Sequence, residues 1–209
     1  MTNYFPPLVI INAGGHGRVI ADIAEQLGYS NIIFVDDRFP QLETNLHWQV
    51  VAKNIDELNV PGAHVFVAIG ACDLRLKLSV RLLKLGYELP SLIHSTASVS
   101  PYAKLGVGSV CMPHAIINIG TKIGIAAIIN SGATVDHDCE IGDGVHISPG
   151  AHIAGGVTIG QGSWIGIGSS IKENIVVGCN TIVGAGSAVV KNFGDNLTVV
   201  GNPAQEKVK

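Results

Sequence analysis

The chain has 209 residues, 47% of them hydrophobic, so it can bury a sizeable core and is not a small disulfide-stapled scaffold. Charged residues make up only 14%, against about a quarter in typical soluble proteins. A formal net charge of −3 argues against a nucleic-acid-binding protein, which normally carries a basic face.

The sequence carries no membrane, export or metal signal. No run of about 20 apolar residues predicts a membrane span. The N-terminal residues lack the basic start and long apolar stretch of a secretory signal, so we expect a cytoplasmic protein. The four cysteines form no C-x-x-C pair, which indicates neither a zinc knuckle nor a redox motif. Small molecules are therefore the expected partners, without nucleic acid or membrane.

The first part of the chain alternates apolar runs with amphipathic segments. The runs cover residues 8–13, 31–35 and 64–69, and the amphipathic segments cover residues 18–27 and 73–85. Strands that alternate with helices form a parallel sheet. We therefore predict a Rossmann-like α/β half-domain over residues 1–92.

A glycine-rich loop follows the first predicted strand. Gly15-His16-Gly17 imitates the dinucleotide fingerprint G-x-G-x-x-G, but Ile20 stands where the third glycine belongs. Ligands bind beyond the carboxyl ends of parallel strands, and a pyrophosphate can dock on the amides of a helix N-terminus. The alternative is a tight strand–helix turn that binds nothing. The candidate residues at this edge of the sheet are Gly15, His16, Gly17, Asp36, Asp37 and Gly70.

From residue 93 onward an aliphatic side chain recurs every six residues. All seventeen positions but Cys111 are aliphatic: Ile93, Val99, Leu105, Cys111, Ile117, Ile123, Ile129, Val135, Ile141, Ile147, Ile153, Ile159, Ile165, Ile171, Val177, Val183 and Val189. A period of six fits a β-solenoid whose coil has three sides of six residues each. We expect these anchors to fill the interior, and the glycines that often follow them to supply the backbone angles of sharp corners.

This hexad array, together with Val200-Gly201-Asn202-Pro203-Ala204 after the last coil, resembles the left-handed β-helix acyltransferases. Combined with the N-terminal Gly-Gly-His-Gly loop and Val135-Asp136-His137-Asp138, it resembles the nucleotide-sugar N-acetyltransferases of the PglD/NeuD type. These enzymes modify 4-amino sugars of surface glycans. The resemblance implies an all-β left-handed parallel β-helix over residues 93–209, acetyl-CoA as cosubstrate and no metal. It also implies a homotrimer with active sites between subunits, which the charge-poor solenoid faces support.

The resemblance also implies roles for single residues. His137 is the general base, and Asp138 polarises it; Asn130 orients the acceptor amine. His146, Gly155 and Ile167 match positions that contact acetyl-CoA. The glycine-rich loop and the acidic pair after the second strand would hold a UDP-sugar.

The His137–Asp138 pair poses a geometrical problem. Neighbouring side chains on a flat strand point to opposite faces, so Asp138 reaches His137 only if the chain turns between them. The alternative is that the pair is merely a polar corner of the solenoid.

Three functions remain open at this point. The first is acetyl transfer to the amine of a UDP-4-amino-4,6-dideoxy sugar by direct attack. The second is O-acetylation of a sialic-acid-type sugar by the same base, to which the nucleotide loop is less suited. The third is a trimeric, carbonic-anhydrase-like protein that holds zinc between subunits.

Overall fold

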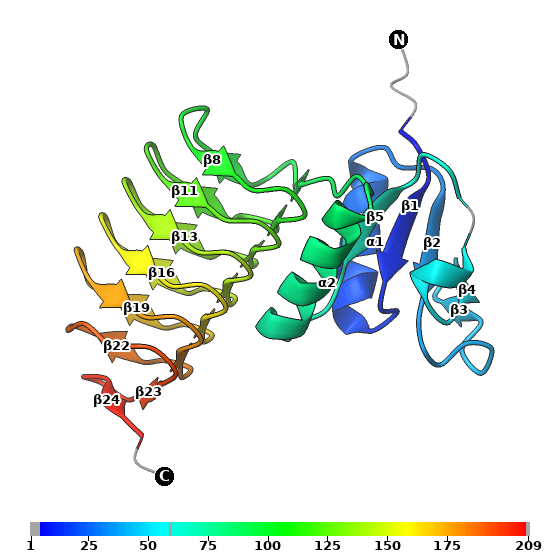
Figure 1. The fold of residues 1–209 in the computed structure, drawn as a ribbon. Helices are drawn as coiled ribbons and strands as arrows, with labels where there is room; N and C mark the ends of the chain where they lie inside the picture. Colours follow the sequence, from blue (N-terminus) through cyan, green and yellow to red (C-terminus); the bar gives the residue numbers. More distant parts are fainter. Residues whose placement is uncertain (1–4, 59, 208–209) are drawn as a thin grey trace. The chain divides into compact units, whose positions relative to one another are not determined.

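The computed structural model describes residues 5–58 and 60–207 and divides into two compact units, Met1–Leu92 and Ile93–Lys209 (Figure 1). The first unit is an α/β domain. Its sheet has the strand order β3-β4-β2-β1-β5, which places β1 between β2 and β5. The strands are β1 (Leu8–Ile11), β2 (Ile32–Val35), β3 (Thr44–Asn45), β4 (Trp48–Ala52) and β5 (His64–Val67). All pairs are parallel except β3 with β4, which confirms the predicted half-domain.

Two α-helices and a short 3-10 helix, η1 (Ile55–Glu57), accompany this sheet. The helices are α1 (Gly15–Gln26) and α2 (Cys72–Lys84). The helix predicted over residues 18–27 therefore starts three residues early, because the glycine-rich loop itself forms the first turn. Ile20, Ile23 and Ala24 form the buried stripe of α1.

The hairpin of β3 and β4 is absent from the prediction. Its turn places Leu46 at a φ of 58°, where hairpins normally use glycine or asparagine, so no turn signal marks it. The Trp48 indole donates a hydrogen bond to the Glu25 carboxylate at 3.0 Å, which ties the hairpin to α1.

The second unit is the predicted parallel β-solenoid, built from two-residue strands with 18 residues per coil (Figure 1). We name its three sheets face 1 (β6, β9, β12, β15, β18, β21, β23, β24), face 2 (β7, β10, β13, β16, β19, β22) and face 3 (β8, β11, β14, β17, β20). The strand bounds are β6 Leu92–Ile93, β7 Ser98–Val99, β8 Lys104–Leu105, β9 Val110–Cys111, β10 Ile116–Ile117, β11 Lys122–Ile123, β12 Ile128–Ile129, β13 Thr134–Val135, β14 Glu140–Ile141, β15 His146–Ile147, β16 His152–Ile153, β17 Thr158–Ile159, β18 Trp164–Ile165, β19 Ser170–Ile171, β20 Val176–Val177, β21 Ile182–Val183, β22 Ala188–Val189, β23 Thr198–Val200 and β24 Gln205–Glu206.

The anchors fill the interior as predicted, except in the first coil. From Cys111 to Val189 every anchor is buried, whereas Ile93 is 38% exposed. Anchors 18 residues apart lie side by side in neighbouring coils, as Ile117 and Val135 do.

The predicted role of the glycines after the anchors is wrong. Gly142 is one of these glycines, and its φ is not positive; a Cβ there would lie 2.6 Å from the backbone nitrogen of Gln161 in the next coil. Close approach of coils, not corner geometry, therefore selects glycine at this position. The left-handed corner residue is the third after the anchor, as at Gly120 (φ 75°) and Gly156 (φ 69°).

Candidate active site

His137 and Asp138 are the two central residues of the turn 136–139, which joins β13 on face 2 to β14 on face 3. Asp138 occupies the third position after the anchor Val135 and has a φ of 58°. This left-handed residue provides the turn that the sequence left undecided. Its carboxylate Oδ2 lies 2.9 Å from Nδ1 of His137, and both side chains are exposed.

The hydrogen bond fixes the protonation geometry of the ring. A carboxylate can only accept, so Nδ1 carries the proton and Nε2 presents its lone pair when the ring is neutral. The hydrogen bond to Asp138 raises the pKa of His137 above its usual value, and the charge of Asp136 raises this pKa further. The arrangement strengthens Nε2 as a base.

Asp136 supports the same turn from its first position. Its Oδ1 accepts the backbone N–H of His137 at 2.8 Å and the side-chain amide of Asn118, one coil away, also at 2.8 Å. These hydrogen bonds lower the pKa of Asp136 and keep it charged. Asn118 was not among the predicted site residues; its offset of 18 residues from Asp136 was the available signal.

A cavity of about 410 Å³ opens beside the imidazole. It is lined by Asp136, His137, Asp138, Ala154, Gly155, Gly156, Glu173 and Asn174. Gly155 lies in the coil after His137, and a Cβ on it would come within 2.6 Å of Nε2. The structure thus brings Gly155 together with His137 and Asp138, and glycine there leaves room for the ring.

The remaining predicted solenoid residues lie elsewhere in the same chain. Asn130 follows β12 on face 1, and its side-chain amide lies 3.1 Å from Nε2 of His146 in β15. The His146 ring stacks on Trp164 at 5.2 Å between centroids. Ile167 is exposed on the corner between faces 1 and 2. This group, which we call the face 1 group (Asn130, His146, Ile167), therefore lies apart from the His137 corner within one chain.

The two loop glycines of the first domain have different surroundings. A Cβ on Gly17 would collide with the carbonyl oxygen of Asn12 and the ring of Phe34, so close packing of α1 on the sheet demands glycine. A Cβ built on Gly15 would meet no described heavy atom within 4 Å apart from its chain neighbours and its own helix backbone, so packing does not demand glycine there.

Burial and the charge of Arg75 lower the pKa of His16 to about 4. The ring is therefore neutral near pH 7 and offers a polar atom, not a positive charge, to a phosphate. Its Nε2 is buried and has no hydrogen-bond partner within the described ranges. Gly70 also borders this edge, and its carbonyl accepts a hydrogen bond from Arg75 at 2.8 Å.

Both carboxylate oxygens of Asp36 already accept hydrogen bonds from residues of the same domain. Its Oδ2 accepts the N–H of Ala13 at 2.8 Å, and Arg38 contacts both carboxylate oxygens at 2.7 and 2.8 Å. These hydrogen bonds, the one from Arg38 first, hold the pKa of Asp36 far below its usual range. Asp36 thus joins the end of β1 to the loop after β2.

A cavity of about 320 Å³ lies at this end of the strands, and Asp36 and Asp37 line it together with Asn12 and Lys53. Asn12 and Lys53 were not predicted as site residues. Asn12 has a φ of 83°, and its side chain donates to the carbonyl of Ala68 at 2.7 Å, so it links the ends of β1 and β5. No motif in the sequence marks either residue.

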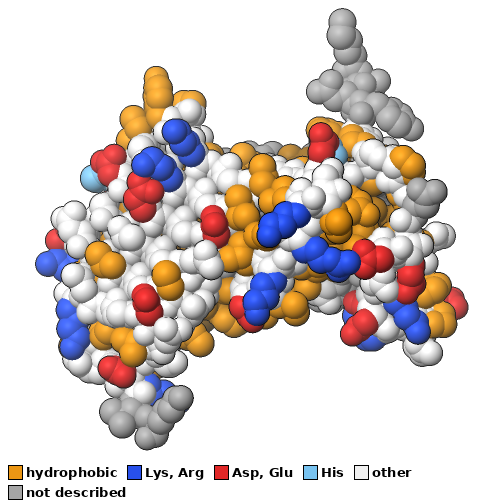
Figure 2. Space-filling view, viewed as in Figure 1, with side chains coloured by type: hydrophobic (Ala, Val, Ile, Leu, Met, Phe, Trp, Pro, Cys, Tyr) orange, Lys and Arg blue, Asp and Glu red, His pale blue; other side chains and the backbone are white. Residues whose placement is uncertain are grey.

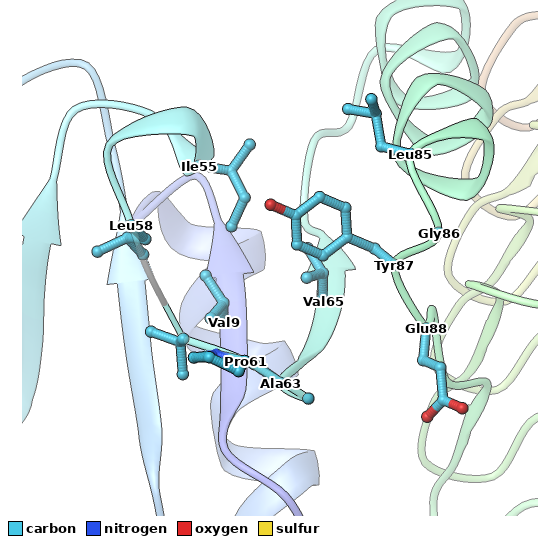
Figure 3. A pocket seen from close by; sticks show the side chains of 12 residues that line it. Val9, Ile55, Leu58, Pro61, Ala63, Val65, Leu85, Gly86, Tyr87 and Glu88 are labelled. Carbon is cyan, nitrogen blue, oxygen red and sulfur yellow. The ribbon is translucent and has the colours of Figure 1, made fainter.

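A second hollow of the first domain, of about 480 Å³, carries no comparable chemistry (Figure 3). Its lining is mainly apolar, with the ring of Tyr87 directed between Val65 and Ile55. Glu88 lies at the rim with its carboxylate turned away from that ring and contacts His64 at 3.1 Å.

The described residues hold neither a metal-binding cluster nor a membrane-spanning helix. No three His, Cys, Asp or Glu side chains of residues 5–58 and 60–207 gather in a way that could hold a metal ion. Among the same residues, no helix is both long and apolar enough to span a membrane.

A hexad solenoid with an exposed, acid-supported histidine beside a cavity defines an enzyme of the hexapeptide-repeat acyltransferase class. Comparison with known proteins agrees. The family described as PglD N-terminal domain matches residues 7–82, and the family described as bacterial transferase hexapeptide (six repeats) matches residues 120–155.

Individual relatives narrow the class. A UDP-N-acetylbacillosamine N-acetyltransferase of Bacillus subtilis is 37% identical over 109 residues, so the match spans about half the length of this curated relative and half of the chain. The acetyltransferase domain of PglB from Neisseria gonorrhoeae is 39% identical, with 96% of this chain and 99% of that chain covered and a TM-score of 0.92. PerB of Caulobacter crescentus, solved with CoA and GDP-perosamine, is 36% identical, with 97% of both chains covered and a TM-score of 0.90. The chain belongs to the hexapeptide-repeat nucleotide-sugar N-acetyltransferase family of the PglD type.

Proposed function

We propose that the protein transfers the acetyl group of acetyl-CoA to the amine of a UDP-4-amino-4,6-dideoxy sugar, with His137 as general base. The observation that carries the proposal is the 2.9 Å pair of His137 and Asp138 at the edge of an open cavity. Relatives that cover nearly the whole chain support it, since one was solved with acetyl coenzyme A and another with CoA and GDP-perosamine.

The chemistry needs one proton acceptor. The amine attacks the thioester carbonyl, and Nε2 of His137 takes the proton that the amine loses. The negative charge of Asp138 stabilises the resulting imidazolium. When the tetrahedral intermediate collapses, the C–S bond breaks, and the CoA sulfur leaves with the proton from the imidazolium. Histidine-to-asparagine and histidine-to-alanine variants of the Caulobacter enzyme were solved with both ligands, which supports a histidine at the reaction centre of that relative.

The cofactor site follows from the same proposal. The cavity beside Gly155 would admit the thioester end of acetyl-CoA, while His146 and Ile167 would contact its pantetheine arm. Because the face 1 group lies apart from His137 in one chain, the proposed site joins the His137 corner of one subunit to face 1 of another. A homotrimer with three such sites meets this requirement, and the visible solenoid surface carries only scattered charges (Figure 2).

The first domain would hold the nucleotide. The backbone amide of Gly15, at the N-terminus of α1, and the neighbouring ring of His16 would face the phosphates. The cavity lined by Asp36 and Asp37 would take the nucleoside. The PglD N-terminal domain match over residues 7–82 supports this assignment.

The two alternatives have less support. The relatives described above are named for N-acetylation or for amino sugars, which favours an amine over a hydroxyl acceptor. The third alternative holds zinc between subunits, and metal analysis of the purified protein tests it: zinc near one per subunit, lost together with activity on chelation, would favour that protein.

The test is a panel of UDP- and GDP-linked amino sugars with acetyl-CoA, read as thiol release and product mass. We expect acetylation of a UDP-4-amino-4,6-dideoxy sugar, and His137→Ala to lower kcat roughly 10²- to 10⁴-fold with a smaller change in substrate KM. An unchanged kcat in that variant would refute the assignment of the base. Acetylation of a free sugar hydroxyl in preference to any amine would favour the O-acetyltransferase.

A further inference from the structure

Many solenoid corners are closed by a hydrogen bond within the turn itself, and we call them self-closed corners. In these corners the N–H of the last turn residue donates to the carbonyl of the first turn residue. Examples are the bond of 3.0 Å from Ala133 to Asn130 and that of 3.1 Å from Ala151 to Ser148. This is the hydrogen bond of an ordinary β-turn.

The corner that carries His137 is closed differently. The N–H of Cys139, the last residue of the turn, donates to Oγ1 of Thr121 at 3.1 Å. The same hydroxyl donates to the carbonyl of Asp136, the first residue of the turn, at 2.6 Å. One hydroxyl group is thus inserted between the two ends of the turn, and it uses both its donor and an acceptor lone pair.

Thr121 is well placed to fix this geometry. It belongs to the preceding coil, is fully buried, and its own carbonyl accepts the N–H of Lys104 at 2.9 Å. Its neighbour Gly120 lies against Asp138, and a Cβ on Gly120 would collide with Oδ1 of that carboxylate. The turn therefore packs against buried residues of the preceding coil. The separation between its first and last residues is set by the one hydroxyl group inserted between them.

We propose that Thr121 is a positioning residue for acetyl transfer, whose hydroxyl holds the turn 136–139 in the form that lets Asp138 reach His137. The inference rests on the function proposed above, since it assigns Thr121 a role through His137. Without the hydroxyl, Cys139 N–H and Asp136 C=O can pair directly, as in the self-closed corners. The turn then tightens, and the carboxylate and the imidazole lose their 2.9 Å contact.

The fold contains a matched control. Oγ1 of Thr181 is also fully buried, accepts the N–H of Leu197 at 3.2 Å and donates to the carbonyl of Gly194 at 2.8 Å. It closes a corner of the same kind that bears no histidine. Thr181→Val therefore removes the two equivalent hydrogen bonds, together with a longer one from Oγ1 to the carbonyl of Cys179 at 3.4 Å, and measures the effect on stability without an effect on His137.

The experiment compares Thr121→Val, Thr121→Ser, Thr181→Val and His137→Ala in the full chain. Three readouts are thermal unfolding, the pH profile of kcat, and the NMR titration of His137. We expect Thr121→Val and Thr181→Val to be destabilised alike. Of the two threonine-to-valine variants, only Thr121→Val should lower kcat, roughly 10- to 100-fold. In this variant His137 should also titrate at lower pH than in the wild type. Asp136 and Glu173 are then the remaining acids around the ring. Thr121→Ser keeps the hydroxyl and should restore kcat to within about threefold.

The outcomes separate this inference from the proposed function. Wild-type kcat and His137 titration in Thr121→Val, alongside an inactive His137→Ala, overturn the inference and leave the proposed function intact. An equal loss of kcat in Thr181→Val also overturns it. Activity retained in His137→Ala overturns the proposed function instead. If Thr121→Val does not fold, Thr121→Cys replaces it, because a thiol makes a weaker bond of the same kind, as Cys139 does to Ala154 at 3.2 Å.

Discussion

A single backbone conformation at Asp138 gives the histidine its acid partner. The third position after each anchor from Leu105 to Val183 is left-handed, and glycine or asparagine occupies it at Gly120, Gly156 and Asn174. Aspartate tolerates this conformation better than most side chains because its short polar group bonds locally. Placing aspartate there directs a carboxylate back toward the preceding residue, which is His137.

Asp138→Asn tests the charge without disturbing the turn, since asparagine also accepts a left-handed backbone. Loss of the carboxylate lowers the pKa of His137, which the wild type holds above its usual value. The base must be neutral to act, so the rise of kcat with pH should begin at lower pH in the variant than in the wild type. We also expect kcat at the plateau to fall roughly 10- to 100-fold, because the base is weaker and less well oriented.

The measurement is a pH profile of kcat with acetyl-CoA at saturation, together with thermal unfolding. Asp195→Asn is a matched control, because Asp195 bonds the backbone N–H of Cys179 in another corner. If kcat of Asp138→Asn begins to rise at the same pH as kcat of the wild type, the proposed role of this carboxylate is contradicted.

At the scale of elements, two loops of the first domain depend on one carboxylate. Asp36 bonds Ala13 after β1 and Arg38 after β2. Asp36 was predicted as a candidate binding residue at this edge of the sheet. Its contacts tie the loops of this edge together from within, while Asp37 beside it is exposed.

Asp36→Ala should therefore raise the KM for the nucleotide sugar, by about tenfold, and leave the KM for acetyl-CoA unchanged. The buried N–H of Ala13 loses its acceptor, which should also cost about 1–3 kcal/mol of unfolding free energy. Initial-rate kinetics with each substrate varied in turn, and chemical denaturation, measure the two effects. Asp56→Ala is the control, because Asp56 forms an exposed ion pair with Arg81 and should change neither quantity appreciably. Equal effects on both KM values would show that Asp36 does not act on the nucleotide edge alone.

The sequence predicted those elements that a repeated local pattern marks. The hexads identified the solenoid because every coil needs an aliphatic side chain at the same interior positions, as at Ile117 and Val135. The hand of the coil has no such signal, since anchors point inward in either hand. The hairpin of β3 and β4 was missed because Leu46 occupies a position that usually needs glycine. The hydrogen bond between Thr121 and Cys139 in neighbouring coils was not predicted. These residues are 18 residues apart, and this spacing was applied to the aliphatic anchors but not to Thr121.

At the scale of the whole molecule, one chain cannot complete the proposed site. His137 lies on the corner between faces 2 and 3, and the face 1 group lies on and beside face 1. A three-sided rod presents these regions in different directions, so only a second copy can bring Asn130 to His137. In the proposed function, assembly is therefore a condition for catalysis and not merely for stability.

This condition predicts that two inactive variants complement each other. In a trimer of His137→Ala and Asn130→Ala chains, a His137 corner from one chain meets a wild-type face 1 from its neighbour at one site of three. Random mixing makes about three quarters of trimers mixed, so about a quarter of wild-type activity should return in the whole mixture and about a third in the isolated mixed trimers. Co-expression with two affinity tags isolates the mixed trimers, and thiol release measures their activity. His137→Ala mixed with Asp138→Ala is the control, because both changes affect the same corner and no intact site can form. No recovery in the first mixture, or a monomer mass by light scattering, would place the whole site within one chain and contradict the shared site.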